Sequence, residues 1–199
     1  MELILASGSE RRRDLLISCG YDFTVIKSEA DESAVKEDDP SELVRKLSLL
    51  KAEAVWESLP VSRRENAAVL GSDTVVALDG EILGKPRSRS DAARMLRAES
   101  GRTNTVHTGV ALIVPDGKGG AAAYVDSDSA RVTFTELDDR EIEAYVSSGE
   151  PLDKAGAYAI QGAFSVFVER VEGNFSSVVG LPVHLVYRML KAVGITPHF

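Results

Sequence analysis

The chain has 199 residues, 44% of them hydrophobic and 27% charged, and a formal net charge of −8 at pH 7. These values are typical of one globular domain, or one domain with two lobes, that buries about 70% of its unfolded surface. The acidic balance argues against a nucleic-acid partner, no apolar run is long enough to span a membrane, and the start at Met1 and Glu2 lacks the basic residues of a signal peptide, so we expect a cytoplasmic protein.

The N-terminal segment predicts a strand, a turn of small residues and a basic helix. The strand covers about residues 2–6 and the helix about 10–19, with Ser9 positioned to cap the helix. Three consecutive arginines from Arg11 place positive charge at the positive end of the helix macrodipole, which is unfavourable unless an anion is bound there. A phosphate group is the expected anion, and an arginine run on a solvated face is the alternative. Cys19 is expected as a small buried residue of this helix, not as a nucleophile.

A second strand over 21–26 precedes a long helix. Asp39 caps this helix and Pro40 occupies its first turn, and the apolar spacing extends to about Ser58. Lys51 lies one helical turn after a leucine of the apolar stripe, at the edge of the buried face. We therefore expect its ammonium group to start from a partly buried position.

The next elements form a predicted hairpin. Residues 68–78 and 81–83 read as two strands joined by Asp79 and Gly80, a dipeptide typical of tight hairpin turns. Asp73 lies inside the first strand, where an ionised carboxylate is costly unless it is paired or bound to a metal. Asp73 is therefore a candidate functional residue, and an aspartate that caps the backbone just before it is the structural alternative.

Two more segments offer candidate ligands. Asp31 and Glu32 lie in an acidic loop and provide a possible second metal ligand, although a solvated loop is the alternative. Residues 80–85 imitate a P-loop, but the glycine spacing is one residue short and Pro86 replaces the hydroxyl residue that holds magnesium. Lys85 can still point at a phosphate. The three histidines share no metal-ligand spacing, and no Gly-x-Ser-x-Gly elbow is present, which disfavours a zinc enzyme or a serine hydrolase.

The rest of the chain alternates helices and strands. The expected elements are a short helix from Ser90 to just before Gly101, strands near 105–114 and 121–134, a helix from Asp138 or Asp139 to Gly149, a strand pair around 157–171, and a last helix from Pro182 to Gly194. This order predicts an α/β fold over residues 1–199, with a twisted, partly antiparallel sheet flanked by helices and with the chemistry at strand ends.

Together these segments resemble the Maf family of nucleoside triphosphate pyrophosphatases nearly from end to end. Any one motif is weak, but their joint order is highly specific. The matching segments are Leu5 to Arg12, Asp31-Glu32, Leu49 to Ala52, Gly71 to Val76, Gly84 to Pro86, Thr108 to Val110, Gly149 to Gly162, and Val178 to Pro182.

The resemblance implies a Maf-like or ITPase-like fold whose two lobes flank a central cleft, and a homodimer is the family expectation. It also implies hydrolysis of a nucleoside triphosphate to the monophosphate and pyrophosphate, with Mg²⁺ or Mn²⁺ as cofactor. Attack on the α-phosphorus needs a carboxylate base and cationic groups that neutralise the leaving pyrophosphate. The implied roles are Asp73 as base, Ser9, Arg12, Lys51 and Lys85 on the triphosphate, and Glu32 with Asp73 near the metal ion.

Three positions resemble those that set substrate preference within the family. Arg11, Thr74 and Gln161 match the branch that acts on dTTP and UTP, while the branch that prefers 7-methyl-GTP has Trp, Gln and Glu. An amide at Gln161 suits the edge of uracil or thymine because it offers a donor and an acceptor. Two residues depart from the family pattern: Glu10 replaces a usual Pro, and Asn104 replaces a common His.

Two functions of another class stay open on the sequence. One is a nucleotide-binding regulator of septum formation with weak or no catalysis, and the other is an interaction protein on the same scaffold. Asp73 argues against a pure binder, since a carboxylate beside a triphosphate contributes little to binding. Lys51, Lys85 and Arg12 argue against an interaction protein that does not bind nucleotides.

Overall fold

The computed structural model describes residues 1–199. Its strands are β1 (Glu2–Leu5), β2 (Thr24–Val25), β3 (Ala67–Leu78), β4 (Glu81–Leu83), β5 (Thr103–Pro115), β6 (Ala121–Phe134) and β7 (Val168–Glu172). Its α-helices are α1 (Glu10–Ser18), α2 (Pro40–Ser58), α3 (Val61–Arg64), α4 (Arg89–Glu99), α5 (Asp139–Ser147), α6 (Phe175–Val179) and α7 (Val183–Ala192). Short 3₁₀ helices are η1 (Glu32–Ala34), η2 (Glu150–Asp153), η3 (Ala155–Ala157) and η4 (Ala163–Phe167).

The strands form one mixed sheet. The order is β2-β1-β3-β5-β6-β7, and β4 pairs with β3. Strand β1 runs parallel to β2 and β3, whereas the β3–β4 and β6–β7 pairs are antiparallel. The predicted twisted, partly antiparallel sheet with flanking helices is therefore confirmed.

The chain divides into two compact units. Unit 1 comprises Met1–Asp73, Thr108–Asp128 and Gly180–Phe199, and unit 2 comprises Thr74–His107 and Ser129–Val179. None of the helices in either unit is both long and apolar enough to cross a membrane.

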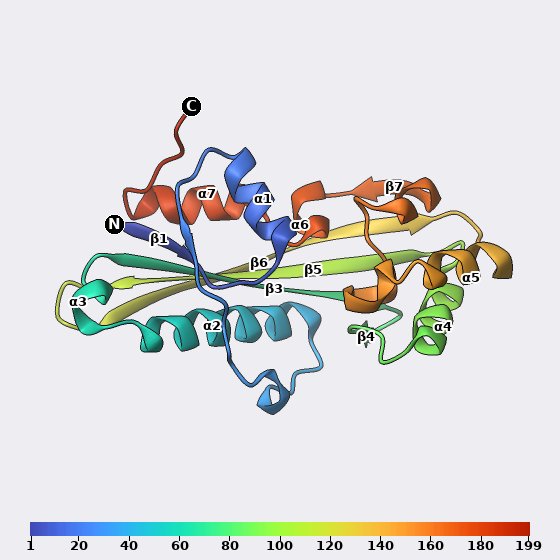
Figure 1. The fold of residues 1–199 in the computed structure, drawn as a ribbon, viewed down its shortest axis with the longest axis horizontal. Helices are drawn as coiled ribbons and strands as arrows, with labels where there is room; N and C mark the ends of the chain where they lie inside the picture. The colour runs from blue at the N-terminus through green and yellow to red at the C-terminus, as the bar shows by residue number, and fades with distance from the viewer. The chain divides into compact units, whose positions relative to one another are not determined.

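Unit 1 has helices on both faces of its part of the sheet (Figure 1). Successive side chains of a strand point to opposite faces, so alternate residues enter different cores. Leu5 and Leu70 pack with Leu16 of α1 and with α7, and Ile4 and Val69 pack with α2 on the other face. This alternation decides which helix each residue at the end of a strand can reach.

Helix α2 lies close against the sheet because two strands carry glycine beneath it. A Cβ atom on Gly71 of β3 would overlap the carbonyl oxygen of Ser48, and one on Gly109 of β5 would overlap the carbonyl oxygen of Val44. The missing side chains let the helix backbone approach the strands directly. The distance between α2 and β3 is thereby fixed two residues before Asp73.

Unit 2 has an aromatic core and one buried acid. Phe164 packs against Phe134 and Tyr158 with ring centroids 4.8 and 5.4 Å apart. Beneath them, Asn104 donates to a Glu99 carboxylate oxygen at 3.0 Å and accepts from the Tyr158 hydroxyl at 3.1 Å. Asn104, a departure from the family pattern, therefore joins a buried polar network.

The hairpin at Asp79 and Gly80 is confirmed. Their φ angles of 52° and 84° are both positive, as a two-residue turn with the twist of the flanking strands requires. The short helix also exists, but its cap is Ser88, not Ser90, because the Ser88 hydroxyl accepts the backbone N–H of Asp91.

The predicted strand pair around 157–171 is wrong. Residues 155–157 and 163–167 form 3₁₀ turns, and only β7 is extended, pairing with β6. The turn at η4 brings Phe164 into the aromatic core, and this burial outweighs the strand propensity of the segment. The strand expected over 21–26 shortens to Thr24–Val25. Cys19 follows α1 as its C-cap and is partly buried against the core.

Candidate active site

The candidate residues of unit 1 gather at the carboxyl end of β1 and at the middle of the neighbouring strand β3. These strands are parallel neighbours, with Leu5 opposite Leu70, so the turn that follows β1 lies beside the next residues of β3, which continues in the sheet to Leu78. The turn from Ala6 to Ser9 continues β1 into α1, and Ser72 and Asp73 continue β3 beyond that register. The expected placement of the chemistry at strand ends fits the turn after β1 but not Asp73, which lies inside β3 because this strand continues beyond its pairing with β1.

A lysine between two carboxylates forms the first half of the site. The Lys51 ammonium lies 2.5 Å from an Asp73 carboxylate oxygen and 3.1 Å from a Glu32 carboxylate oxygen. The Lys51 and Asp73 side chains are 14% and 11% exposed, so water screens their attraction poorly, whereas Glu32 is 49% exposed. Pairing with Lys51 therefore satisfies the carboxylate of Asp73, and the alternative of an aspartate that only caps the backbone is not needed.

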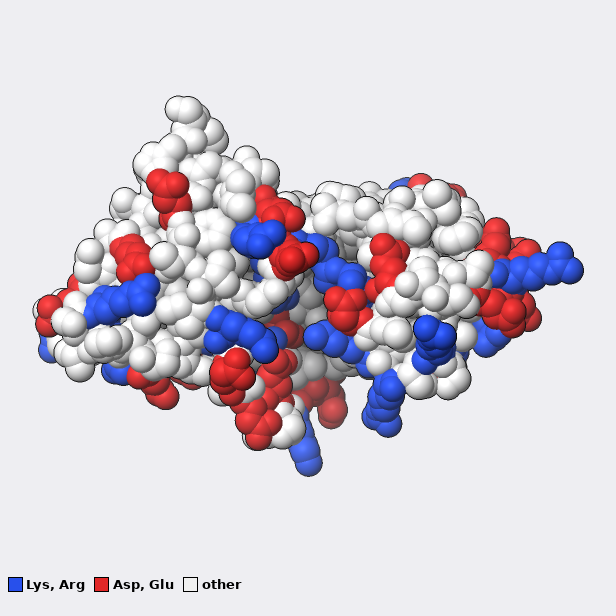
Figure 2. Space-filling view, in the orientation of Figure 1, with Lys and Arg blue, Asp and Glu red and all other residues white.

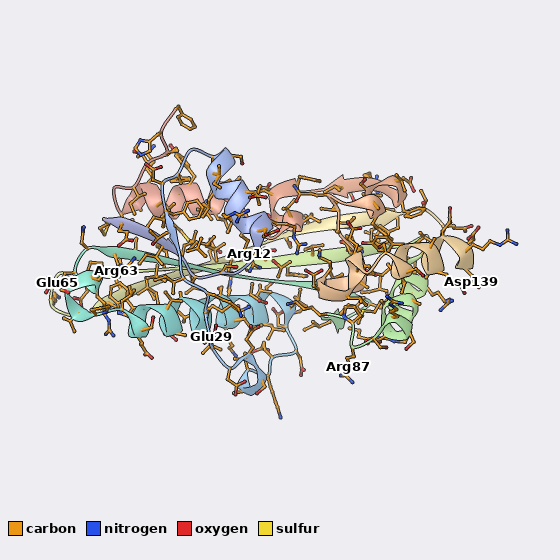
Figure 3. All side chains as sticks on the ribbon, in the orientation of Figure 1. Arg12, Glu29, Arg63, Glu65, Arg87 and Asp139 are labelled. Atoms are coloured by element: carbon orange, nitrogen blue, oxygen red, sulfur yellow. The ribbon has the colours of Figure 1, made fainter.

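An arginine on the opposite face of the sheet forms the second half. Arg12, labelled in Figure 3, extends from the first turn of α1; its Nε donates to the Gly180 carbonyl at 2.8 Å and its Nη1 to the Ser7 hydroxyl at 3.3 Å. Burial lowers the pKa of Arg12 from its ordinary value, and the negative charge of Asp73 opposes this shift. The guanidinium remains a cation because its ordinary pKa is far above neutrality.

Ser9 and Arg11 accompany Arg12. Ser9 occupies the N-cap position of α1, but its hydroxyl makes no capping hydrogen bond; instead its backbone N–H donates to the Ser7 hydroxyl at 3.2 Å. Arg11 is half-buried. Glu10 is the acidic residue of the first helical turn, where its charge is favourable toward the macrodipole.

The other predicted residues belong to unit 2. Thr74 is half-buried, while Lys85 and Gln161 are exposed. The turn before Lys85 is held by a hydrogen bond from the Gly156 N–H to the Gly84 carbonyl at 3.2 Å. This bond links the Lys85 turn to the segment that leads to Gln161.

The loop that carries Gln161 is anchored by the buried side chain of Tyr145 and the half-buried side chain of Glu150. The Ala159 N–H donates to the Tyr145 hydroxyl at 3.1 Å, and the Glu150 carboxylate packs so close to Gly162 that a Cβ there would overlap it. The pKa of Tyr145 is raised, chiefly by burial. Gln161 therefore projects from a loop whose backbone is fixed on both sides.

Three contributors to this site are not among the site residues predicted from the sequence. Gly180 supplies a carbonyl, Ser72 donates its hydroxyl to that carbonyl at 3.1 Å, and Ser7 contacts Arg12. Each lies in a segment that matches a family motif, and this match is the one signal in the sequence that singles them out.

Carboxylate oxygens suit a hard divalent cation, and Glu32 and Asp73 both contact the Lys51 ammonium, so their oxygens lie within reach of one cation. The structure contains no group of three or more His, Cys, Asp and Glu residues that could hold a metal ion. A bound nucleotide would have to supply further oxygen ligands, as is usual for Mg²⁺ sites with few carboxylates.

On the face visible in Figure 2, basic and acidic side chains lie near one another, with uncharged surface between the groups. Within unit 1, Arg45 pairs with Glu42 at 2.8 Å and Lys46 pairs with Glu37 at 2.6 Å. The basic residues of the site are thus a local feature, which suits a small polyanion better than a duplex.

Comparisons with known proteins show which family and which fold the chain is similar to. A family model described as "Maf-like protein" matches residues 2–193. A dTTP/UTP pyrophosphatase of Bacillus anthracis (strain CDC 684 / NRRL 3495) is 44% identical over 194 residues, 98% of this chain and 96% of the relative. One of Symbiobacterium thermophilum is 45% identical over 193 residues, with 97% and 94% covered. The solved Ham1 protein of Staphylococcus aureus aligns with a TM-score of 0.51 at 16% identity, over 97% of this chain and 100% of that one, which shows a shared fold.

Proposed function

Because the chain belongs to the Maf family and its similar relatives are named dTTP/UTP pyrophosphatases, we propose that it is a nucleoside triphosphate pyrophosphatase that favours dTTP and UTP. The enzyme hydrolyses its substrate to the nucleoside monophosphate and pyrophosphate. The observation that carries the assignment of the chemistry is the carboxylate of Asp73, which lies inside strand β3 and is held beside the ammonium of Lys51.

Asp73 is assigned as the general base. A water oxygen attacks the α-phosphorus while Asp73 accepts a proton from that water, and the bond from the α-phosphorus to the bridging oxygen breaks as pyrophosphate leaves. Lys51 holds the carboxylate in place at 2.5 Å and stabilises its negative charge until the proton arrives. Nearby Glu32 shares the ammonium, so Lys51 keeps an acidic partner when Asp73 becomes neutral.

The triphosphate is assigned to the cationic and hydroxyl groups predicted for it. Arg12 and Lys51 neutralise charge that builds on the leaving pyrophosphate, and Ser9 and Lys85 add a hydroxyl and a further ammonium. In support, two hydrogen bonds already hold the Arg12 side chain in place, so it loses little conformational freedom when a phosphate binds.

Glu32 and Asp73 are the residues assigned to a divalent cation, Mg²⁺ or Mn²⁺. When bound, the cation would polarise the phosphoryl oxygens and neutralise part of the triphosphate charge. The shared contact with Lys51 supports the assignment, since both carboxylates already face one positive charge.

Base preference is assigned to Arg11, Thr74 and Gln161. The exposed amide of Gln161, on a loop anchored by Tyr145 and Glu150, can present a donor and an acceptor to a pyrimidine edge. These three residue types match the branch of the family that acts on dTTP and UTP.

The direct test is a screen of nucleoside triphosphates with and without Mg²⁺ or Mn²⁺, in which added inorganic pyrophosphatase converts released pyrophosphate to phosphate. We expect the highest kcat/KM for UTP and dTTP, and release of the nucleoside monophosphate. Binding of nucleotides with no phosphate signal under any metal condition would contradict the proposal and favour the nucleotide-binding regulator.

A further inference from the structure

Ser72 and Asp73 are consecutive in β3 and therefore point to opposite faces of the sheet. Asp73 faces α2, where it meets Lys51. Ser72 faces the other way, as Leu70 does, toward the core formed with α1 and α7. Ser72, the residue next to the proposed base, thus faces the side of the sheet on which α1 carries Arg12.

The Ser72 hydroxyl is completely buried and donates to the carbonyl oxygen of Gly180 at 3.1 Å. Arg12 Nε donates to the same oxygen at 2.8 Å. A carbonyl oxygen has two lone pairs, so it can accept both hydrogen bonds. The oxygen therefore connects a residue of the strand to the guanidinium on α1.

The orientation of this carbonyl depends on the residue that carries it. Gly180 has a φ of 120°, which side chains rarely allow, and it directly precedes the Leu181-Pro182 start of α7. A glycine here is conformationally free in the unfolded chain, and the buried Ser72 hydroxyl adds a fixed donor that selects one direction of the carbonyl. Without that donor, the acceptor of Arg12 would be less well defined.

We propose that Ser72 is a positioning residue for Arg12, acting through the carbonyl of Gly180. Ser72 orients the acceptor, the acceptor and the Ser7 hydroxyl fix the plane of the Arg12 guanidinium, and the guanidinium binds the triphosphate. This inference rests on the proposed role of Arg12 in holding the triphosphate. It assigns no contact between Ser72 and the substrate.

The test is a double-mutant cycle of Ser72→Ala and Arg12→Ala, with KM and kcat for UTP and the melting temperature measured for each protein. We expect Ser72→Ala to raise KM about three- to tenfold, the size expected for one lost hydrogen bond, with a smaller effect on kcat. In the Arg12→Ala background, Ser72→Ala should leave KM unchanged, because the group that it positions is absent.

Ser48→Ala is the matched control, since Ser48 is also completely buried but donates to the Arg45 carbonyl of its own helix. It should leave KM unchanged. Ser72→Cys, which keeps the branching of the side chain and a weak donor on a slightly larger atom, should give a KM between those of the wild type and Ser72→Ala, and it serves as the test variant if the alanine protein does not fold.

The possible failures are distinguishable. An unaltered KM in Arg12→Ala would overturn the proposed role of Arg12 itself. A raised KM in Arg12→Ala with an unaltered KM in folded Ser72→Ala would overturn the positioning role alone. An equal increase from Ser72→Ala in both backgrounds would show that Ser72 acts independently of Arg12, and would also overturn the inference.

Discussion

The Lys51 ammonium lies 2.5 Å from a carboxylate oxygen of Asp73, and this contact joins helix α2 to strand β3. The approach depends on Gly71, two residues before Asp73 on the same face, where a side chain would overlap the backbone of α2 at Ser48. Ser48 lies one turn before Lys51. Close packing of backbone on backbone therefore sets the length of the ion pair.

Gly71→Ala should lower the melting temperature and the turnover together. The added methyl group must displace α2 or β3, and overpacking of this kind costs about 1–3 kcal/mol. A displacement of α2 also moves Lys51 away from Asp73. Gly84→Ala is the control for stability, because a Cβ at Gly84 meets nothing within 4 Å. An unchanged melting temperature in Gly71→Ala would show that the helix accommodates the methyl group.

Asp73→Asn should reduce kcat by about 100-fold or more, because an amide cannot accept the proton of the attacking water. The fold should persist, since the amide has nearly the same shape and Lys51 keeps its contact with Glu32. Turnover and melting temperature should be measured on the same preparations. Near-normal turnover in the folded variant would rule out Asp73 as the base.

Arg12→Ala and Lys51→Ala should raise KM and lower kcat for every nucleotide alike, because both residues are assigned to the triphosphate that all substrates share. Arg13→Ala is the matched control for Arg12: Arg13 is the next residue of α1, and it is exposed and paired with Asp14. The measurement is steady-state kinetics for UTP, dTTP, CTP and 7-methyl-GTP. A change in the order of preference would show that the residue reads the base or the ribose.

Gln161→Glu should decrease kcat/KM for UTP and dTTP by about 10- to 100-fold relative to a guanine nucleotide. A carboxylate opposite a pyrimidine carbonyl places two acceptors face to face, and each mismatched polar group costs about 1–3 kcal/mol. Because Gln161 is exposed, the fold should tolerate the change. Adding Thr74→Gln and Arg11→Trp should extend the shift.

Gln161→Ala separates the loss of the hydrogen bonds to the base from the repulsion between two acceptors, since it removes the hydrogen bonds without adding a carboxylate. It should affect UTP and dTTP less than Gln161→Glu does. Ratios of kcat/KM that stay constant across the four nucleotides in Gln161→Glu would show that Gln161 is a scaffold residue.

Glu99 predicts a pH dependence of stability. Burial raises the pKa of Glu99 well above its ordinary value, and Asn104 opposes the shift only in part, so the folded protein holds a proton that the unfolded chain releases. Stability should therefore decrease as the pH rises from about 4.5 toward the raised pKa, by up to about 1.4 kcal/mol per pH unit for this one group.

Glu99→Gln should remove this dependence, because the amide is neutral at every pH. The melting temperature of the variant should exceed that of the wild type by an amount that increases with pH. Glu143→Gln is the matched control, an exposed glutamate of α5 in the same unit. A constant difference in melting temperature between Glu99→Gln and the wild type from acidic to alkaline pH would contradict the prediction.

The sequence by itself determined most of the elements of this fold. Periodicity and caps predicted α2 from Asp39 and α5 from Asp138 or Asp139, and the Asp79-Gly80 turn predicted the β3–β4 hairpin, because these signals are local to a few residues. The sequence also singled out Asp73 as a carboxylate in an apolar strand and Lys51 as a cation at the edge of a buried face.

Only the tertiary structure decided how these residues combine. The pairing of Lys51 with Asp73 depends on the packing of α2 over Gly71, and the link from Ser72 to Arg12 passes through the carbonyl of Gly180, 108 residues along the chain. The strand pair expected around 157–171 failed for the same reason, because burial of Phe164 among residues distant in sequence outweighs the local preference for strand. Local signals fix conformation within a segment, whereas contacts between segments depend on the path of the whole chain.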